Sequence, residues 1–173
     1  ATAALVADAL GARKAAAYDL LAGCTGFVYA LAQAYGQVAT GLSSRALVIG
    51  SEVLSKITNW QDRSTCILFG DGAGAAVVRP VEAGGIAGIE LGADGSGGPD
   101  LCVPAGGSRR PMSTDAIEEE AQFIRMNGAE VFRRNLPEGD ISYSTFALSS
   151  STSETAFFTG DVDPGALVPG INI

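Results

Sequence analysis

The feature that most constrains the fold is an apolar segment of residues 15–42, "AAAYDLLAGCTGFVYALAQAYGQVATGL", which contains a single charged residue, Asp19. Residues 15–21 have the length and composition of a fully buried strand. From Gly26 to Gly41 the apolar residues recur at helical spacing, and this predicted helix has almost no polar face, so we expect it to be buried on all sides. Residues 45–52, "RALVIGSE", predict a second buried strand, which the helix would connect to the first as a parallel crossover. The segment therefore predicts an α/β fold.

The flanking sequence adds shorter elements. Residues 3–11 have the spacing of a short amphipathic helix that ends at Gly11. Strands are expected in "AGAAVVRPV" (73–81) and over residues 85–95, followed by a long loop over residues 96–114. Asp115 is positioned to cap a helix whose acidic first turn suits the positive end of the helix dipole.

Composition excludes several classes of function. The net charge of -8 disfavours binding to nucleic acid and to anionic membranes, because both present phosphate groups. Glycines interrupt the apolar segment, and the N-terminus lacks a basic start, so neither a membrane span nor a signal peptide is expected. Three cysteines, an odd number, do not form a disulfide framework, and reduced thiols fit a cytoplasmic location.

Cys24 is the candidate for chemistry. It lies in "LAGCTG", where the predicted strand turns into the predicted helix, so backbone N–H groups and the helix dipole would favour its thiolate form. The small neighbours Ala22, Gly23 and Gly26 would let a substrate approach the sulfur. From position alone, an inert packed thiol and a reactive thiol both remain open. Cys66 is expected to be buried for structural reasons and Cys102 to lie in a loop.

Two further motifs have plain structural interpretations. "GDGAG" at 70–74 lacks the lysine and hydroxyl residue of a nucleoside-triphosphate loop and precedes a predicted strand, so a tight glycine-rich connection is favoured. Trp60 and Arg63 stand on a polar loop, "NWQDRSTC", where a solvated arginine and a partly buried tryptophan are expected. An arginine can also stack on a flat heterocycle or pair with phosphate. No metal site is expected.

Taken together, "AAAYDLLAGCTGFVYAL", "ALVIGSEVLSKITNWQDRSTCILFGDGAGAAVV" and "IRMNGAEVF" closely resemble β-ketoacyl-acyl carrier protein synthase III. This family belongs to the thiolase-like superfamily, a layered α/β fold with a buried helix that bears the nucleophile, and the resemblance covers about residues 1–134. It implies that Cys24 accepts an acyl group from coenzyme A and that the enzyme condenses this group with malonyl-acyl carrier protein, releasing CO2. It also implies a cytoplasmic homodimer that needs no cofactor, with acyl-coenzyme A and malonyl-acyl carrier protein as partners.

The resemblance also assigns binding residues. Arg63 matches the family arginine that packs on the adenine of coenzyme A, and Phe69 matches a position lining the acyl pocket. Met126, Gly128 and Phe132 match the segment "M-x-G-x-E-V-F" along the pantetheine tunnel. In this interpretation "GDGAG" is a structural signature without a phosphate role.

The chain departs from the family pattern at both ends, and the departures that matter for catalysis concern the second half of the pattern. The "H-Q-A-N" and "G-N-T-S" segments, which carry the His and Asn that assist decarboxylation of malonyl, are absent, and the chain contains no histidine. The first strands of the family are also missing. We therefore expect a partial condensing-enzyme domain over residues 1–134, unable to condense. Residues 135–173 contain no Lys or Arg and are expected to be a divergent tail, either unstructured or the product of a frameshift, a junction or a wrongly assigned gene end.

Three alternatives remain open. Polyketide-priming synthases and hydroxymethylglutaryl-coenzyme A synthase use related coenzyme A thioester chemistry, although the complete "DRSTCILFGDGAGA" run favours synthase III. A noncatalytic interaction module, or pseudoenzyme, is the third alternative, and the absence of histidine supports it.

Overall fold

The structure is a computed structural model that describes residues 1–134, 145–149 and 155–158 of the chain. It divides into two compact units. The first contains Ala1–Val48, Ala76–Glu90 and the described strands of the tail; the second contains Ile49–Ala75 and the described residues 91–134. Each unit is described by itself.

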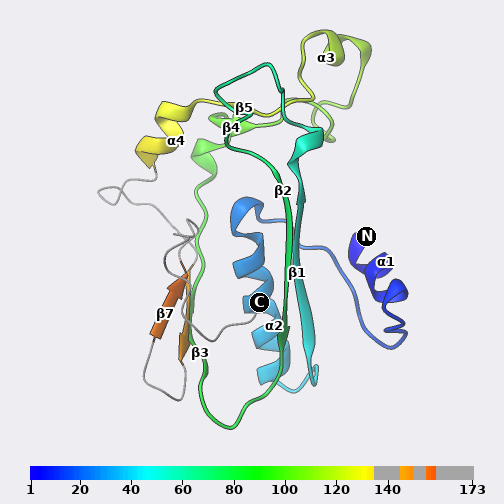
Figure 1. Ribbon diagram of the computed structural model, residues 1–173, viewed down its shortest axis with the longest axis vertical. Helices are drawn as coiled ribbons and strands as arrows, with labels where there is room; N and C mark the ends of the chain where they lie inside the picture. Colours follow the sequence, from blue (N-terminus) through cyan, green and yellow to red (C-terminus); the bar gives the residue numbers. More distant parts are fainter. Residues whose placement is uncertain (135–144, 150–154, 159–173) are drawn as a thin grey trace. The chain divides into compact units, whose positions relative to one another are not determined.

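The elements are shown in Figure 1. The first unit contains α1 (Thr2–Ala9), the 3-10 turn η1 (Gly23–Thr25), α2 (Gly26–Ala39), β3 (Gly85–Glu90), β6 (Thr145–Ser149) and β7 (Thr155–Phe158). The second contains η2 (Leu54–Lys56), η3 (Gly95–Gly97), β4 (Leu101–Cys102), α3 (Thr114–Glu118), β5 (Arg125–Met126) and α4 (Gly128–Arg134). Two strands, β1 (Ala46–Val53) and β2 (Asp71–Val78), form a two-stranded sheet.

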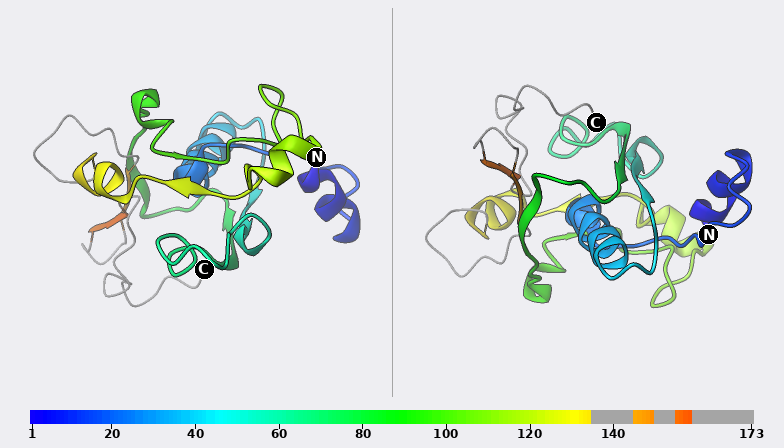
Figure 2. Two further views of the ribbon diagram at one scale, coloured as in Figure 1. Left: turned by 90° about the horizontal axis from the view of Figure 1, so that it is seen from above. Right: turned by 90° about the horizontal axis from the view of Figure 1, so that it is seen from below.

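One face of α2 forms the core of the first unit. Val28, Leu31 and Ala34 lie on the same side of the helix and are buried together with Val48 of β1. Seen along its axis in Figure 2, α2 lies between the β1–β2 pair and β3, and partly buried Ile89 of β3 joins the same cluster. The helix over residues 26–39 is thus confirmed, but its burial on all sides is wrong. Tyr35 of α2 is 43% exposed.

The predicted strand over residues 15–21 is also wrong. This segment has no strand pairing in the described structure, and Leu21 is 96% exposed. An apolar run becomes a buried strand only when neighbouring strands satisfy its backbone groups, and no described strand does so here. Without that strand, the expected parallel crossover to β1 is not formed.

Side chains hold the segment in place of a strand ladder. The Asp19 carboxylate accepts hydrogen bonds from the backbone N–H groups of Thr2 and Ala3, both at 2.7 Å, at the start of α1. The Tyr18 hydroxyl accepts a hydrogen bond from Gln37 Nε2 of α2 at 2.8 Å. The short helix predicted over residues 3–11 is confirmed as α1, which is followed by Gly11 at φ +69°.

The second unit consists of short elements joined by backbone hydrogen bonds. Strands β4 and β5 pair antiparallel, and the backbone N–H of Ile124 donates to the carbonyl of Ile57 at 2.8 Å. Ala105, Ala116 and Ala121 form a small buried cluster.

The cap predicted for α3 is displaced by two residues. Ser113 Oγ accepts a hydrogen bond from the backbone N–H of Ala116 at 3.2 Å, so Ser113 is the N-cap. Ser113 has the extended backbone that is typical of an N-cap residue and that lets its side chain turn back toward the helix. Asp115 lies two residues later, inside the first turn of α3. The long loop expected over residues 96–114 also contains η3 and β4.

The tail is described only in part. Strand β6 pairs antiparallel with β3 and with β7, giving a three-stranded sheet. Residues 135–144, 150–154 and 159–173 lie outside the described residues. The domain boundary at residue 134 therefore stays a prediction. In the part of the chain that the structure describes, no helix has both the length and the apolar character needed to cross a bilayer.

Candidate active site

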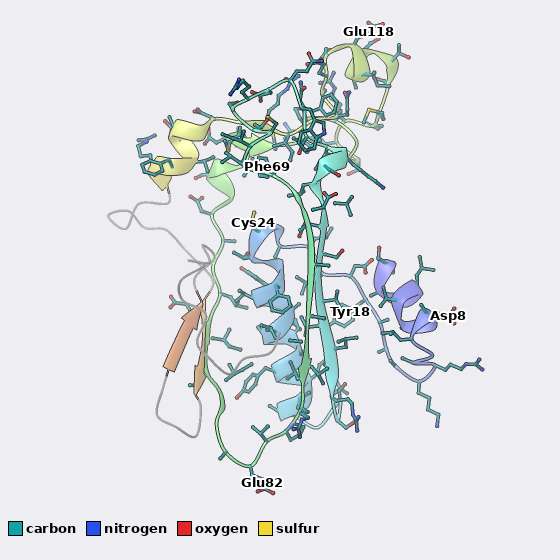
Figure 3. The ribbon with its side chains drawn as sticks, in the orientation of Figure 1. Asp8, Tyr18, Cys24, Phe69, Glu82 and Glu118 are labelled. Atoms are coloured by element: carbon teal, nitrogen blue, oxygen red, sulfur yellow. The ribbon has the colours of Figure 1, made fainter. Side chains whose placement is uncertain are left out.

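Cys24 lies at the middle of the 3-10 turn η1, directly before α2. Figure 3 shows its side chain beyond the N-terminal end of α2, and the residue is exposed. The turn predicted at Cys24, before the helix, is therefore confirmed. The position exposes the sulfur to solvent near the positive end of a 14-residue helix, where negative charge is stabilised.

Glycine 23 gives the turn its shape. Gly23 has φ +57°, in the left-handed region that side chains with a Cβ rarely adopt. A Cβ placed there would meet no atom within 4 Å, so the requirement for glycine is conformational and does not come from crowding. Thr25 closes the same turn, since its hydroxyl donates to the carbonyl of Ala22 at 2.9 Å.

The other two cysteines have different surroundings. All three are free thiols, but Cys66 and Cys102 are half-buried whereas Cys24 is exposed. Cys102 does not lie in a loop as predicted, because it pairs with Arg125 in the β4–β5 ladder. The burial predicted for Cys66 is only partial. Exposure therefore singles out Cys24 as the thiol most accessible to a substrate.

Arg63 and Phe69 lie on the connection between η2 and β2, in the second unit. Asp62 organises this connection: its carboxylate accepts hydrogen bonds from the backbone N–H of Ser64 (2.9 Å), from Ser64 Oγ (2.6 Å) and from Thr65 Oγ1 (2.8 Å). The hydrogen bond from the Ser64 hydroxyl, followed by that from the Ser64 N–H, lowers the pKa of Asp62. Arg63 is exposed at this turn, and Phe69 is half-buried beyond it.

Two buried threonines anchor the connection. Thr58 is 1% exposed and its hydroxyl donates to the carbonyl of Leu54 at 2.8 Å; Thr65 is 0% exposed. The Thr65 hydroxyl donates to the Asp62 carboxylate, so both buried hydroxyls have hydrogen-bond partners and the free-energy cost of burying them is small. The loop that carries Arg63 is thus fixed at two points.

Asp71 fixes where this connection ends. Its carboxylate accepts hydrogen bonds from the backbone N–H of Ser55 at 2.8 Å and from Ser55 Oγ at 2.7 Å. These bonds, that from the backbone N–H first, lower the pKa of Asp71. In "GDGAG" the strand β2 begins at Asp71, so residues 71–74 are part of the strand and not the connection predicted from their glycines. Asp71 thereby ties the first residues of β2 to η2.

Met126, Gly128 and Phe132 lie on β5 and α4 of the second unit. Met126 pairs with Leu101 in the β4–β5 ladder, and a Cβ on Gly128 would lie 3.5 Å from Met126 Cε. Phe132 is 68% exposed. The structure therefore places Met126 and Gly128 in close proximity and leaves the Phe132 ring open to solvent.

The predicted site residues are divided between the units. Cys24 belongs to the first unit, and the five predicted binding residues belong to the second. Among the described residues, no group of His, Cys, Asp or Glu is arranged to hold a metal ion. The supporting roles of Asp62 and Asp71 were missed by sequence reasoning. The "DRST" pattern, an aspartate followed by two hydroxyl residues, is the signal that could have revealed the first.

Comparison with known proteins finds similarity to one family of enzymes. Residues 18–95 match the family model of 3-oxoacyl-[acyl-carrier-protein] synthase III. A β-ketoacyl-[acyl-carrier-protein] synthase III of Desulfitobacterium hafniense is 58% identical over 134 residues, which is 77% of this chain and 40% of that protein. About three quarters of this chain is therefore similar to part of a synthase III sequence. A synthase III of Clostridioides difficile is 49% identical over 132 residues, 76% of this chain and 40% of its own length.

Solved synthase III structures confirm the predicted fold class, a partial thiolase-like α/β fold. A crystal structure from Thermus thermophilus aligns with TM-score 0.63 and 48% identity, covering 76% of this chain and 40% of that structure. A structure of the priming β-ketosynthase from the R1128 polyketide pathway aligns with TM-score 0.65 and 37% identity, over 76% of this chain and 38% of that structure. The chain thus spans about 40% of the length of the curated synthase III relatives it matches.

Proposed function

We propose that this chain is part of a β-ketoacyl-acyl carrier protein synthase III, which begins fatty acid synthesis, and that Cys24 is its acyl-accepting nucleophile. The observation that carries the proposal is the position of Cys24. It is an exposed thiol on a turn shaped by Gly23, at the N-terminal end of α2, within the residues that match the family model.

The first half-reaction uses this thiol. The Cys24 thiolate attacks the carbonyl carbon of an acyl-coenzyme A, and the new C–S bond forms as the thioester bond to coenzyme A breaks. Coenzyme A leaves as a thiolate and takes up a proton, so no redox change and no further cofactor is involved. The positive end of α2 stabilises the attacking thiolate and the oxyanion that develops in the transition state.

The second half-reaction joins the acyl group to malonyl-acyl carrier protein. Malonyl loses CO2, its carbanion attacks the acyl-Cys24 carbonyl, and the Cys24 thiolate leaves with the β-ketoacyl product formed on the carrier protein. The family pattern assigns assistance in this decarboxylation to a His and an Asn, and the chain contains no histidine. We therefore propose that the 173-residue chain performs the first half-reaction alone.

The same proposal assigns roles to the predicted binding residues. Arg63 binds the nucleotide end of coenzyme A, Phe69 lines the acyl pocket, and Met126, Gly128 and Phe132 line the path of the pantetheine arm. The closeness of Met126 and Gly128 supports a shared surface there, because a Cβ at position 128 would lie in van der Waals contact with Met126 Cε, at 3.5 Å. The proposal extends to a partial domain over residues 1–134 and to a cytoplasmic homodimer of the full-length enzyme.

The proposal is tested by mass spectrometry after incubation with acetyl-coenzyme A. We expect one acetyl group on Cys24 in the unaltered chain and in Cys66→Ala, and none in Cys24→Ala. When malonyl-acyl carrier protein is added, the acetyl group should remain on Cys24 and no β-ketoacyl product should form, because no imidazole is present to assist decarboxylation. Acetylation spread equally over the three thiols, or its absence, would support the noncatalytic alternative. Condensed product would overturn the restriction to the first half-reaction.

A polyketide-priming synthase is a second candidate, supported by the similarity to the R1128 priming β-ketosynthase. The two candidates share the acyl transfer to Cys24 and differ in the starter acyl group. Competition among acetyl-, propionyl- and branched acyl-coenzyme A for Cys24 separates them: a marked preference for a longer or branched starter favours the priming synthase.

A further inference from the structure

Glu120 has a backbone conformation that a glutamate rarely adopts. It follows the end of α3 with φ +55°, and among the residues that the structure describes it is the one residue other than glycine with a positive φ. Glycine adopts this left-handed conformation without strain, whereas a residue with a Cβ does so at a cost in free energy. A strained residue of this kind persists when other interactions hold it, and it points to a functional constraint.

The hydrogen bonds at the end of α3 explain why the chain turns there. The backbone N–H of Ala121 donates to the carbonyl of Ala116 at 2.8 Å, and that of Glu120 donates to the carbonyl of Ile117 at 3.0 Å. Ala116 and Ala121 are also buried together. This is the Schellman arrangement, in which the residue at the position of Glu120 is usually glycine. The end of the helix therefore requires the left-handed conformation, and a glutamate occupies the position that suits glycine best.

The Glu120 side chain reaches the connection between η2 and β2, which carries Arg63. Glu120 Oε2 accepts a hydrogen bond from Asn59 Nδ2 at 3.2 Å, across 61 residues of chain and within the second unit. The backbone N–H of Ile124 donates to the Ile57 carbonyl at 2.8 Å, so the segment after α3 contacts the start of this connection at two points. A glycine at position 120 would relieve the backbone strain but would lose the contact made by the side chain.

Asn59 links this contact to the turn that precedes Arg63. Asn59 Oδ1 accepts a hydrogen bond from the backbone N–H of Gln61 at 3.0 Å, and the backbone N–H of Asp62 donates to the Asn59 carbonyl at 3.1 Å. The amide side chain of Asn59 thus uses its acceptor to shape the turn and its donor to bind Glu120. Because Arg63 directly follows this turn, the hydrogen bond to Glu120 restrains the backbone that presents the guanidinium group.

We propose that Glu120 is a positioning residue, which acts through Asn59 to hold the connection in the orientation in which Arg63 binds acyl-coenzyme A. This inference rests on the proposed function and adds to it a residue that acts through Arg63. The glutamate side chain improves binding, whereas glycine would give the more relaxed backbone after α3. Thermal stability and affinity for coenzyme A should therefore respond differently to substitutions at position 120.

Three substitutions separate the hydrogen bond from the strain. Glu120→Ala and Glu120→Gly both remove the acceptor, so each should weaken coenzyme A binding about three- to tenfold in calorimetry. Glu120→Gly also removes the strain, so its melting temperature should exceed that of Glu120→Ala by about 2–4 °C. Glu120→Gln keeps an acceptor and should retain most of the affinity. Glu118→Gln is the control: it removes a charge from an exposed residue of α3 and should leave the affinity unchanged.

An exchange of the two groups tests the hydrogen bond itself. Asn59→Asp can still accept from the Gln61 N–H but places a second carboxylate against Glu120, so it should weaken binding. Addition of Glu120→Gln to Asn59→Asp lets the glutamine Nε2 donate to the new carboxylate and should recover most of the lost affinity. In a chain that carries Arg63→Ala, Glu120→Ala should weaken binding further by less than about twofold, because both substitutions act on the same contact.

The outcomes separate this inference from the proposed function. If Arg63→Ala weakens coenzyme A binding and Cys24 is acetylated while Glu120→Ala and Glu120→Gly bind normally, the inference is overturned and the proposed function stands. An affinity that recovers together with the melting temperature in Glu120→Gly would assign Glu120 a structural role alone and would also overturn the inference, as would an exchange that fails to recover binding. If the unaltered chain neither binds coenzyme A nor is acetylated at Cys24, both are overturned.

Discussion

At the scale of single residues, the geometry around Cys24 depends on its neighbour. Gly23 adopts φ +57° with open space around its α-carbon, and Thr25 ties the turn back to Ala22. The backbone turns at position 23, so Cys24 lies just before the first residue of α2. The position of the thiol is therefore set by the backbone conformation of a residue that takes no part in the chemistry.

Replacement of Gly23 tests this dependence. Gly23→Ala should lower the free energy of unfolding by about 1–2 kcal/mol, because alanine is strained at positive φ, and should slow acetylation of Cys24. The measurement is urea unfolding together with the rate of acetylation. Gly36→Ala is the matched control: Gly36 lies within α2 with nothing within 4 Å of a Cβ, so alanine there should raise helix stability by about 0.5–1 kcal/mol. Equal effects of the two substitutions would contradict the argument.

At the scale of elements, α1 depends on one carboxylate. None of its residues is buried, and Asp19 accepts hydrogen bonds from the first two backbone N–H groups of the helix. These bonds, that from Ala3 first and that from Thr2 second, lower the pKa of Asp19. Because the carboxylate is favoured in the folded state, it stabilises α1 above the ordinary pKa of about 3.9.

Acid should therefore weaken the attachment of α1. As the pH falls from about 4 through the lowered pKa of Asp19, the carboxylate takes up a proton and its contribution is lost. We expect the NMR signals of Thr2 and Ala3 to shift toward unfolded values over that interval while those of α2 stay in place. Asp19→Asn should show the weakened state at neutral pH and no such transition on acidification. A transition retained in Asp19→Asn would assign the effect to another group.

Elements formed by local signals were the ones that could be predicted. The periodic apolar residues of α2, the small-residue turn at Cys24 and the helix before Gly11 depend on nearby sequence. The apolar run of residues 15–21 was misassigned because a strand depends on distant partners that its own sequence does not specify. Asp71 was missed as an organising residue for a related reason, because its carboxylate acts across 16 residues of chain, on Ser55. Asp62 acts on the nearby residues Ser64 and Thr65, so its local sequence pattern could have revealed its role.

At the scale of the whole molecule, much apolar surface faces solvent. Along β1, the alternating residues Leu47, Ile49 and Val53 are exposed, whereas Val48 on the opposite face is buried against α2. Val77 on the neighbouring strand β2 is 64% exposed. Exposed apolar side chains of this kind favour association in water. We therefore expect the isolated chain to associate or to have low solubility.

Size-exclusion chromatography with light scattering tests that expectation. We expect a mass above that of the monomer which rises with concentration, and we expect Ile49→Lys to shift the distribution toward monomer by placing charge in the apolar row. Leu42→Lys is the control, because Leu42 is 78% exposed but lies outside the strand pair. A monodisperse monomer with a single cooperative melting transition would show that the exposed row does not drive association.

The exposure of Cys24 also determines how readily the protein is oxidised during storage. A thiol that is open to acyl donors is equally open to dissolved oxygen and peroxide, and oxidation to a sulfenic acid or to an intermolecular disulfide would remove the nucleophile. The half-buried Cys66 and Cys102 should be lost more slowly. Preparations stored without reductant should therefore lose acyl-accepting capacity while their secondary structure is unchanged, and a bound acyl group should preserve the sulfur until it is needed.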